Sequence, residues 1–440
     1  MCGGHGRGEE GREPWRYLGD SMGKASILMV AGYSLLMLVS GLNLSSVSTQ
    51  AYDNSLSYYE NAMVRNIAVA GANMAANYLF LYPPLVNGNP WWGGYANPVK
   101  FAGGTFRVTV DSTSSVDPLT GDRRLTIRST AAYRDSAYSV QVVMRPSNFA
   151  KFAVYAGPSA ANAYWETGDS AFGPVHTQGT LKVAGRPYFG GKVSTKNGVD
   201  STSYGGSNHP IFNAGLESGV SIPLNKTYQR LGPAATANGK HFTTAGDLYL
   251  TFKGDSVGYR RTSAGTDTMK YLPTWAPNGT IVLGRGNIYV KGTVKGRYTV
   301  AALDSVTGTS SGRVIVTDDI RYQTNPRTTP SSTDMLGIVA YNDVCISGST
   351  TKTSFYVDAT MFSFKKGVTV ENYSTRSPGI FYTLGGWIVE NIYATSNGIP
   401  LGTSGSKGFK CNIRFDERFR TSAPPFFPTT GTYEILAWYE

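Results

Sequence analysis

The stretch GPVHTQGTLKVAGRPYFGG, from Gly173 to Gly191, sets glycine or proline every few residues between short runs of apolar side chains. Leu181 and Val183 alternate with polar neighbours, and Phe189 continues the apolar set after the next corner. Period-two alternation predicts strands with one buried face, and glycine with proline predicts sharp corners between them. The stretch therefore predicts short strands joined by tight turns.

Similar short strands continue towards the C-terminus and are too small to fold alone, so they are expected to stack as coils. We expect a right-handed parallel β-helix over residues 149–440, with a β-sandwich as the alternative, because sandwiches also contain short strands. Residues 197–245 lack a clear period and are expected to form an insertion, while residues 416–440 are expected to cap the last coil. The further runs are Thr280–Gly286, Asn287–Gly292, Thr293–Val300, Arg313–Asp319, Gly337–Gly348, Val368–Tyr373 and Gly385–Ala394.

Composition supports a mainly β chain with more than one folded unit. The 440 residues include 52 glycines and 28 tyrosines, and only 16% are charged, which fits short strands and many turns. The formal net charge is +11, but no run of five or more basic residues occurs. We therefore expect no sequence-specific nucleic-acid binding, and only attraction to a polysaccharide or another anionic surface.

An uncharged segment lies near the N-terminus, from Ala25 to Tyr52. Its core, ILMVAGYSLLMLVSGLNL at Ile27–Leu44, approaches the roughly 20 apolar residues that span a bilayer; a buried core helix is the alternative. We expect the chain to contact the membrane through residues 25–47, with residues 1–24 as a leader or cytoplasmic segment. Four basic groups precede the apolar run and favour a cytoplasmic N-terminus and an exported body: Arg7, Arg12, Arg16 and Lys24.

The helix is expected to continue beyond the membrane, since no proline occurs between Pro14 and Pro83. Pro83 and Pro84 should end it, because proline cannot donate a backbone hydrogen bond. Apolar residues in steps of three and four predict one amphipathic stripe: Leu56, Tyr59, Met63, Ile67, Ala70, Met74, Tyr78 and Leu81.

Three alternating segments follow, at residues 106–110, 125–127 and 138–144, with turn residues between them. They predict a small antiparallel sheet whose apolar face packs on the helical stripe. Residues 25–148 therefore form one predicted module.

The boundary GKASIL, from Gly23 to Leu28, followed by the apolar run and the amphipathic helix, resembles type IV pilin-like proteins, particularly PilX-type minor pilins. The resemblance implies that a prepilin peptidase cleaves between Gly23 and Lys24 and that a bacterial inner membrane anchors the chain. It also implies pilin-like or envelope protein partners. The fifth residue after Gly23 is Leu28, where the family usually has glutamate. Translation from Met22 is an alternative that would remove the preceding residues.

The stretch GPVHTQGTLKVAGRPYFGGKV also resembles β-helical segments of bactofilin-like and pilus-associated envelope proteins. The closing segment PPFFPTTGTYEILAWYE, from Pro424 to Glu440, resembles the end of the same uncharacterised envelope domain. Both resemblances concern architecture and imply no chemistry.

Motifs for chemistry are sparse. The sequence contains no phosphate-binding glycine loop. The spacing of His176, His209 and His241 is not that of metal ligands. We therefore expect no cofactor, metal or catalytic residue. His176 is expected to be an edge residue hydrogen-bonded to a backbone carbonyl. The sequence leaves undecided whether Cys345 and Cys411 form a disulfide. Six acidic residues could serve glycoside chemistry but are expected to cap turns instead: Asp318, Asp319, Asp343, Asp358, Asp416 and Glu417.

Together these features predict a membrane-anchored, pilin-like structural protein of the bacterial envelope, with its bulk in the periplasm or on the cell surface. It would act as a pilus or pseudopilus component or as an adhesion module, and not as an enzyme. The alternative is a membrane-tethered β-helix that binds or cleaves polysaccharide.

Overall fold

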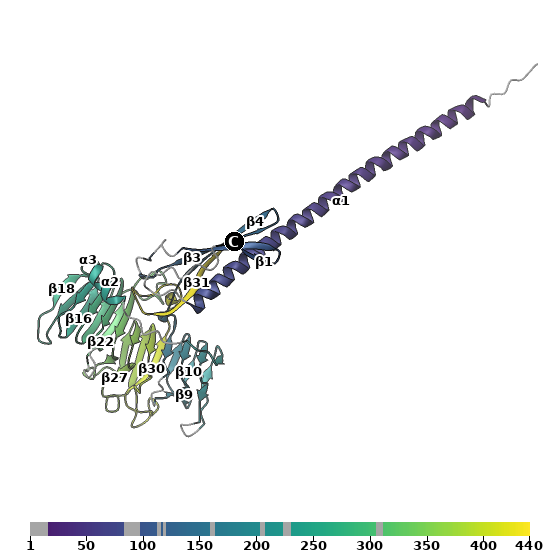
Figure 1. Ribbon diagram of the computed structural model, residues 1–440. Helices are drawn as coiled ribbons and strands as arrows, with labels where there is room; N and C mark the ends of the chain where they lie inside the picture. The colour runs from purple at the N-terminus through teal and green to yellow at the C-terminus, as the bar shows by residue number, and fades with distance from the viewer. Residues whose placement is uncertain are drawn as a thin grey trace, which may run out of the picture.

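A computed structural model describes residues 16–82, 97–111, 116–117, 120–158, 163–202, 207–222, 230–304 and 311–440, with side chains from residue 23 onward. One long helix, α1 (Arg16–Leu81), runs away from the remainder of the molecule (Figure 1). We call α1 and the antiparallel sheet beside it the stem, and the larger body from β5 to β30 the head. The chain is thus mainly β with one long N-terminal helix, as predicted.

The 66 residues of α1 give a length of about 100 Å at about 1.5 Å per residue. The helix ends at Leu81, just before Pro83, as expected. Its packing face differs from the predicted stripe: Ile67 is buried, but Tyr59, Met74 and Leu81 are exposed. The buried face is instead rich in small residues, because these let the sheet approach the helix closely: Val64, Ile67, Ala68, Ala72, Ala75, Ala76 and Leu79.

Gly71 marks the closest approach of α1 to the sheet. A Cβ atom there would lie 2.5 Å from Ser129 Oγ and 2.8 Å from the ring of Phe106. The sheet therefore packs where α1 offers no side chain, which turns the larger apolar side chains of the predicted stripe towards solvent.

The stem sheet is antiparallel, in the order β1-β2-β3-β4-β31. The predicted alternation is confirmed, because Phe106 and Val108, Leu125 and Ile127, and Val140 are buried against α1. The strands are β1 (Val99–Phe101), β2 (Gly104–Asp111), β3 (Leu125–Tyr133), β4 (Ser136–Asn148) and β31 (Thr429–Tyr439).

The prediction that residues 416–440 cap the last coil is corrected by the structure. Residues 429–439 form β31, which pairs antiparallel with β4, with Ile435 opposite Met144. The preceding Pro425 and Phe427 lie against the middle of the coils, at Thr299 and Phe362. The stem sheet offers β31 an unpaired strand edge as well as an apolar face, so the segment completes that sheet and does not cover an end of the head.

The head contains parallel sheets whose apolar side chains form one buried core. Among the described residues, ten strands form the sheet β14-β11-β8-β5-β29-β26-β23-β21-β19-β15. Its neighbours pair in parallel, unlike the antiparallel strands of the β-sandwich alternative. The bounds, in that order, are Leu216–Ser218, Val193–Thr195, Val175–Thr177, Val154–Ala156, Gly386–Val389, Thr360–Ser363, Met335–Ala340, Arg297–Ala302, Thr280–Leu283 and Lys240–Phe242.

A second sheet of thirteen described strands follows the order β13-β10-β7-β30-β28-β25-β22-β20-β16-β17-β18, with β24 and β27 paired beside β22. Only the hairpins β16-β17 and β17-β18 are antiparallel in it. In the same order its bounds are Ile211–Phe212, Tyr188–Phe189, Ser170–Phe172, Phe409–Arg414, Gly379–Leu384, Ser354–Val357, Val314–Tyr322, Ile288–Val294, Leu248–Gly254, Ser256–Arg260, Thr268–Tyr271, then β24 (Val344–Ile346) and β27 (Val368–Val370).

A short third sheet joins β12, β9 and β6. The remaining described elements are short helices at turns and connections. The list is β12 (Val199–Asp200), β9 (Leu181–Ala184), β6 (Trp165–Glu166), η1 (Phe149–Lys151), α2 (Leu231–Asn238), α3 (Leu272–Trp275) and η2 (Glu417–Arg420).

The order of strands in space differs from their order in the chain. The chain enters the ten-stranded sheet in its middle at β5 and proceeds through β8 and β11 to one end at β14. It then restarts at the opposite end with β15 and returns to β29, which pairs with β5 through Trp387 opposite Val154. We call this junction of two chain segments the seam.

The expected insertion at residues 197–245 is only partly separate from the coils. Its strands β12, β13 and β14 pair in parallel with β9, β10 and β11 and so continue the stack. Helix α2 packs beside β19, and β15 begins the far end of the stack. Strands of two or three residues carry too little alternation to be recognised from the sequence.

Corner turns of the coils are held by aspartates, as expected for turn-capping residues. Asp358 accepts a hydrogen bond from the backbone N–H of Tyr322 at 3.0 Å, and Asp334 accepts from that of Gly296 at 2.7 Å. Each carboxylate binds an amide of the preceding coil, so these residues fix the stacking of coils.

The stem and head meet through buried aromatic rings, at a region we call the joint. Phe149 of η1 lies 4.9 Å from Tyr155 of β5 and 5.6 Å from Phe362 of β26. Phe427 lies 6.1 Å from Phe362 on the other side. These four side chains are fully buried, so the outer face of the ten-stranded sheet is covered where the stem docks.

Candidate functional site

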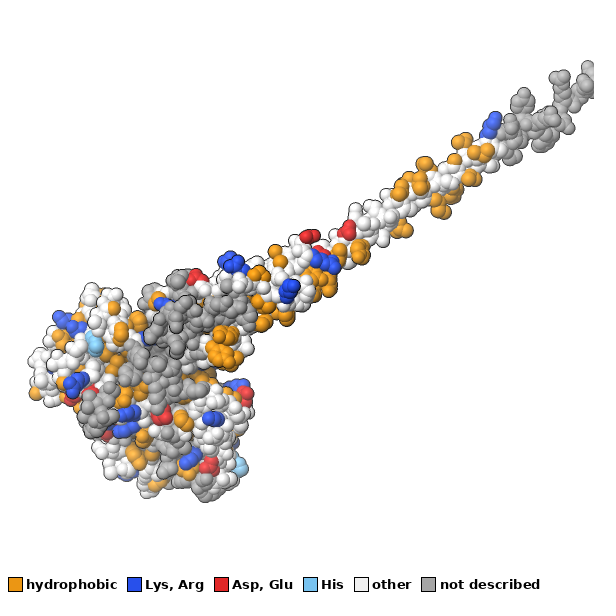
Figure 2. Space-filling model, viewed as in Figure 1, with side chains coloured by type: hydrophobic (Ala, Val, Ile, Leu, Met, Phe, Trp, Pro, Cys, Tyr) orange, Lys and Arg blue, Asp and Glu red, His pale blue; other side chains and the backbone are white. Residues whose placement is uncertain are grey.

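The outer half of α1 carries an apolar surface that the rest of the described chain does not cover. Side chains from Ile27 to Leu44 are exposed, with Leu36 at 64% and Leu44 at 72% of their full exposure. Figure 2 shows hydrophobic side chains along this part of the helix beyond the stem sheet. Within Gly23–Leu81 the helix is long and apolar enough to cross a membrane. This surface requires lipid or an apolar protein partner.

Gly23 and Lys24 both lie within α1 and are exposed. A Cβ placed on Gly23 would have no heavy atom within 4 Å, so no described part of the chain shields the Gly23–Lys24 bond. Cleavage at this bond stays a prediction.

In the head, a cleft lies at the seam. Elsewhere the connections from the ten-stranded sheet to the thirteen-stranded sheet carry short paired strands, β24 with β27 and β9 with β6 and β12. In the connection after β29, residues 390–408 form no strand, and an isolated bridge joins Ser396 to Gly408. The ladder is therefore interrupted, and a cleft of about 370 Å³ lies at the interruption. We call it the seam cleft.

The loop 390–408 is held in shape by its own hydrogen bonds. Asn397 donates from its side-chain amide to the carbonyl of Gly405 at 2.8 Å, and its side-chain oxygen accepts from the N–H of Lys407 at 3.0 Å. Ordered loops of this length inside a compact domain are usually functional.

The walls of the seam cleft are largely aromatic. Tyr164, Tyr373 and Tyr393 line it and are half-buried, whereas Trp165 is buried deeper, with its ring 5.3 Å from that of Phe189. Half-buried rings next to polar side chains can pack against the C–H faces of a ligand that also forms hydrogen bonds.

The floor holds a buried ion pair. Lys410 Nζ donates to Glu166 at 2.6 Å and to Ser396 Oγ at 3.1 Å, and the lysine side chain is only 3% exposed. Asp169 beside it accepts from the N–H groups of Cys411 at 2.8 Å and Glu166 at 2.9 Å. Burial raises the pKa of Asp169 to about 6. Both carboxylates are thus fully engaged within the protein.

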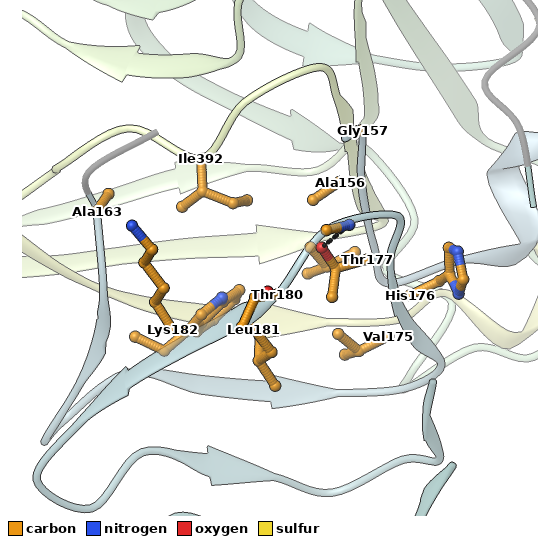
Figure 3. A pocket seen from close by; sticks show the side chains of 13 residues that line it. Ala156, Gly157, Ala163, Val175, His176, Thr177, Thr180, Leu181, Lys182 and Ile392 are labelled. Carbon is orange, nitrogen blue, oxygen red and sulfur yellow. Dashed lines mark hydrogen bonds between the residues drawn. The ribbon is translucent and has the colours of Figure 1, made fainter. Parts of the chain in front are cut away.

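His176 lines a separate cavity of about 30 Å³, which shares Ala163, Trp165 and Ile392 with the seam cleft. Figure 3 shows its ring on the opposite side of β8 from Val175 and Thr177. The ring is fully buried, 5.3 Å from that of Tyr155, and Nδ1 lies 2.8 Å from Ser194 Oγ. The expectation of an edge residue bound to a backbone carbonyl is therefore wrong, because the joint covers this face. Burial lowers the pKa of His176 to about 4.

The six acidic residues considered from the sequence are distributed among separate structural contacts. Asp318 and Asp319 bind Lys352, and Asp343 binds Arg313 at 2.9 Å. Asp358 caps a corner as described, Asp416 caps η2 by accepting from the N–H of Arg418, and Glu417 binds Arg420. No group of three metal-ligating side chains occurs in the described part of the chain.

Cys345 and Cys411 are both buried free thiols. Cys345 lies on β24 and Cys411 on β30. Burial raises the pKa of Cys345 to about 11 and that of Cys411 well above its usual value, so neither forms a reactive thiolate at neutral pH.

Sequence reasoning missed Glu166, Ser396 and Lys410, which build the floor of the seam cleft. The one available signal was Lys410 in the strand FKCNIR, where a lysine lies between buried apolar residues. Glu166 and Ser396 gave no signal in the sequence, because only the pairing of distant segments at the seam brings them to Lys410.

Comparison with known proteins gives structural likenesses but no sequence relative. No family model and no curated protein matches the chain. Among solved structures it is similar to the competence-associated pilin ComZ from Thermus thermophilus, at 11% identity, with a TM-score of 0.31, over 86% of this chain and 96% of that chain. A TM-score of this size carries no inference about function. The stem itself is a long helix with one half packed on an antiparallel sheet and one half apolar and exposed, which is the arrangement predicted from the sequence.

Proposed function

We propose that this chain is a pilin-like component of a type IV pilus or pseudopilus, anchored in a bacterial inner membrane, which presents its head for adhesion or contact. The division of α1 supports this proposal. Its outer half exposes apolar side chains over about four to five turns, whereas its inner half is fixed to the stem sheet. A helix of this form serves equally well in a bilayer and in a bundle of like helices.

The inner half of α1 offers a second apolar contact surface. Tyr59, Met74 and Tyr78 remain 52%, 41% and 39% exposed although they belong to the predicted stripe. Because Gly71 and small residues supply the packing face, these larger side chains keep a solvent-exposed surface that a neighbouring subunit could cover. We propose that they contact adjacent pilin-like helices.

The head is proposed to be a right-handed parallel β-helix with a non-enzymatic role. Its parallel ladders and aspartate-capped corners support a stacked-coil architecture. The dispersal of its candidate carboxylates supports a role in binding rather than cleavage. The Gly23–Lys24 bond is proposed as the processing site.

Fractionation of sheared filaments tests this function. The chain should be found in the filament fraction of cells that assemble pili. Replacing Tyr59 and Tyr78 by serine should reduce its share there at least fivefold, while urea unfolding of the head stays unchanged. Replacing Tyr249 and Tyr289, which stack on each other at 4.5 Å on the head, is the matched control. Retention of all the protein in the inner membrane of piliated cells would refute the proposal.

A second candidate function, polysaccharide binding, rests on the seam cleft. Its aromatic walls and its internally paired floor suit an uncharged, polyhydroxylated ligand. Titration of the full chain in detergent with neutral tetrasaccharides, such as cellotetraose and chitotetraose, should change the fluorescence of Trp165. Tyr393→Ala should weaken binding at least tenfold and Tyr249→Ala should not. No binding at 10 mM of either sugar would count against it.

A further inference from the structure

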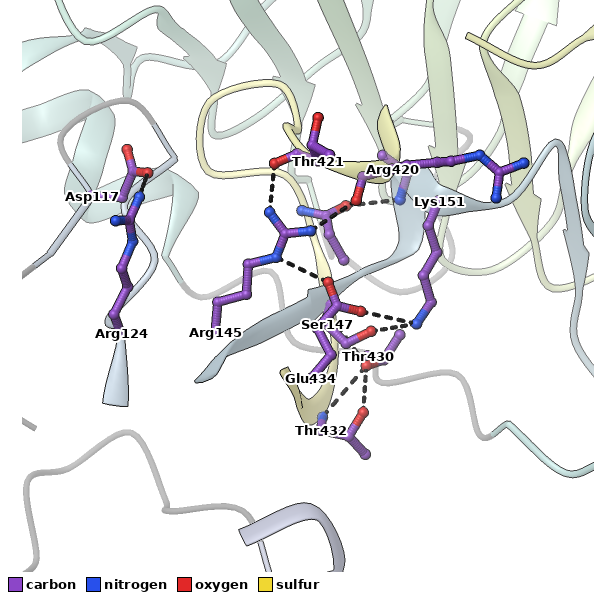
Figure 4. Close-up of polar contacts among 12 residues, drawn as sticks. Asp117, Arg124, Arg145, Ser147, Lys151, Arg420, Thr421, Thr430, Thr432 and Glu434 are labelled. Atoms are coloured by element: carbon purple, nitrogen blue, oxygen red, sulfur yellow. Dashed lines mark hydrogen bonds and ion pairs between the residues drawn. The ribbon is translucent and has the colours of Figure 1, made fainter. Parts of the chain in front are cut away.

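A second cavity, of about 130 Å³, lies at the joint between stem and head. We call it the joint cavity. The turn before β3, strand β4 and β31 form its stem side, and Arg297 of β21 with residues 419–423 form its head side. Figure 4 shows polar side chains of these segments meeting in this region. A ligand here would touch both parts of the molecule.

The lining of the joint cavity carries an excess of positive charge. Three carboxylates line it, those of Asp117, Asp122 and Glu434, against five cationic side chains. Two positive charges are therefore left over. The five cationic residues are Arg124, Arg145, Lys151, Arg297 and Arg420.

Part of this excess arises because one carboxylate serves two cations. Glu434 binds Arg145 at 2.9 Å and Lys151 at 3.3 Å. Asp117 binds Arg124 at 2.9 Å, and its charge also acts on the neighbouring Arg297. The Glu434 group thus retains one uncompensated positive charge.

Two further lining charges are balanced from outside the cavity. Asp122 binds Arg230 at 2.8 Å, and Arg420 binds Glu417 at 2.5 Å. One of these outside partners is positive and the other negative, so counting them leaves the excess of two positive charges unchanged. The second excess charge therefore belongs to Arg124 and Arg297 together, which have the one carboxylate of Asp117 between them.

Arg297 has no ion-pair partner among the described residues. The internal segments outside the described ranges contain no aspartate or glutamate in the sequence. Its Nη2 donates to Ser422 Oγ at 2.6 Å and to the carbonyl of Ala423 at 2.8 Å, whereas its buried Nε has no hydrogen-bond partner. Burial lowers the pKa of Arg297. Asp117 acts on this half-buried guanidinium without forming a direct ion pair with it, so its burial is only partly compensated.

We propose that the joint cavity binds a small dianionic oxyanion of the phosphate or sulfate type, with Arg297 as its main anchor. The guanidinium fork matches oxyanion geometry and favours such ligands. At about 130 Å³ the cavity is larger than the space that a single water needs, which leaves room for one tetrahedral oxyanion. Two negative charges would cancel the excess of the lining, and binding would tie the stem to the head.

Thermal unfolding of the full chain in detergent tests this proposal. Sodium phosphate or sulfate at 10 mM should raise the Tm by at least 3 °C relative to sodium chloride of equal ionic strength, because a ligand that binds only the folded state stabilises it. Calorimetric titration with inorganic phosphate should give a saturable Kd. An equal Tm shift in chloride, or no saturable binding, would overturn the proposal.

Substitutions locate the ligand. Arg297→Gln should weaken phosphate binding at least tenfold, and Arg128→Gln, on the exposed face of β3, should leave it unchanged. Circular dichroism in chloride checks that Arg297→Gln folds; if it does not, Lys151→Gln, which removes the other excess charge, should weaken binding in its place. If whichever of these two variants folds binds phosphate with unchanged affinity, the assignment is refuted.

A comparison of phosphate sources completes the test. Glycerol 3-phosphate and glucose 1-phosphate present the same group on larger molecules. If they bind with the affinity of inorganic phosphate, the cavity takes the phosphate of an envelope lipid or glycan; if they bind more than tenfold more weakly, it takes the free ion. Both outcomes require the dependence on Arg297.

Discussion

Protonation of His176 should destabilise the head below neutral pH. The imidazole is fully buried at the joint between aromatic rings, and its pKa is lowered from 6.5 to about 4. A lowered pKa means that the folded state is more stable with the neutral imidazole than with the charged imidazolium. Its contribution to stability is therefore complete above pH 6.5 and is lost as the pH falls towards 4.

The size of the effect follows from linkage. A difference of this size between folded and unfolded pKa values removes about 2 kcal/mol of stability at pH 5 and about 3 kcal/mol at pH 4, relative to pH 8. Asp169 and Asp358 act in the opposite direction, because burial raises the pKa of each to about 6. Their protonation favours the folded state as the pH falls, so the parent protein alone would not isolate His176.

The assay is therefore a comparison of variants. Urea unfolding of the full chain in detergent, followed by tryptophan fluorescence, is measured at pH 8 and pH 5 for the parent and His176→Gln. Glutamine cannot be protonated and retains a partner for Ser194. Between the two pH values the parent should lose about 2 kcal/mol relative to the variant. His209→Gln, at an exposed position, should behave as the parent.

Parallel pH profiles of the parent and His176→Gln, within about 0.5 kcal/mol, would refute this reasoning. Such a result would mean that His176 is solvated or paired when protonated, and hence that the joint does not cover β8.

Three further predictions concern the head. Lys410→Met should destabilise it by about 2 kcal/mol or more in urea unfolding, because it leaves the half-buried Glu166 without its cation; a loss below about 0.5 kcal/mol would mean that the pair is solvated. Gly292→Ala should cost at least about 2 kcal/mol, because φ is +109° and a Cβ would clash with the carbonyl oxygen of Phe252 on the neighbouring strand, and an unchanged urea midpoint would contradict this close approach of β16 and β20. In a chain carrying Cys2→Ser, Cys345 and Cys411 should react with Ellman's reagent only on unfolding, at least a hundredfold faster in urea than in buffer, whereas rapid reaction of that native chain would contradict their burial.

Much of the stem could be predicted from the sequence, because its signals are local. The end of α1 before Pro83 and the alternation of β2, β3 and β4 each depend on residues close together in the chain. The face of α1 that packs could not be predicted, since Gly71 and its small neighbours decide it by allowing close approach. Hydrophobicity alone favoured Tyr59 and Met74, which the structure leaves exposed.

The short strands of the head could be predicted, but the order of these strands in the sheets could not. Successive coils resemble one another, so nothing local indicates that β29 pairs with β5 or that β31 leaves the head to join β4. The seam cleft depends on that order, because Glu166 and Lys410 meet only across the seam. Asp358 was predictable as a capping residue because turn capping is a local property.

Mass spectrometry of the N-terminal peptide tests the central claim, that this chain is a processed pilin-like subunit, most directly. Protein recovered from sheared filaments should begin at Lys24, with the bond after Gly23 cleaved. Gly23→Leu should abolish that peptide and remove the chain from the filament fraction. Filament material in which the residues before Gly23 remain joined to Lys24 would contradict the account.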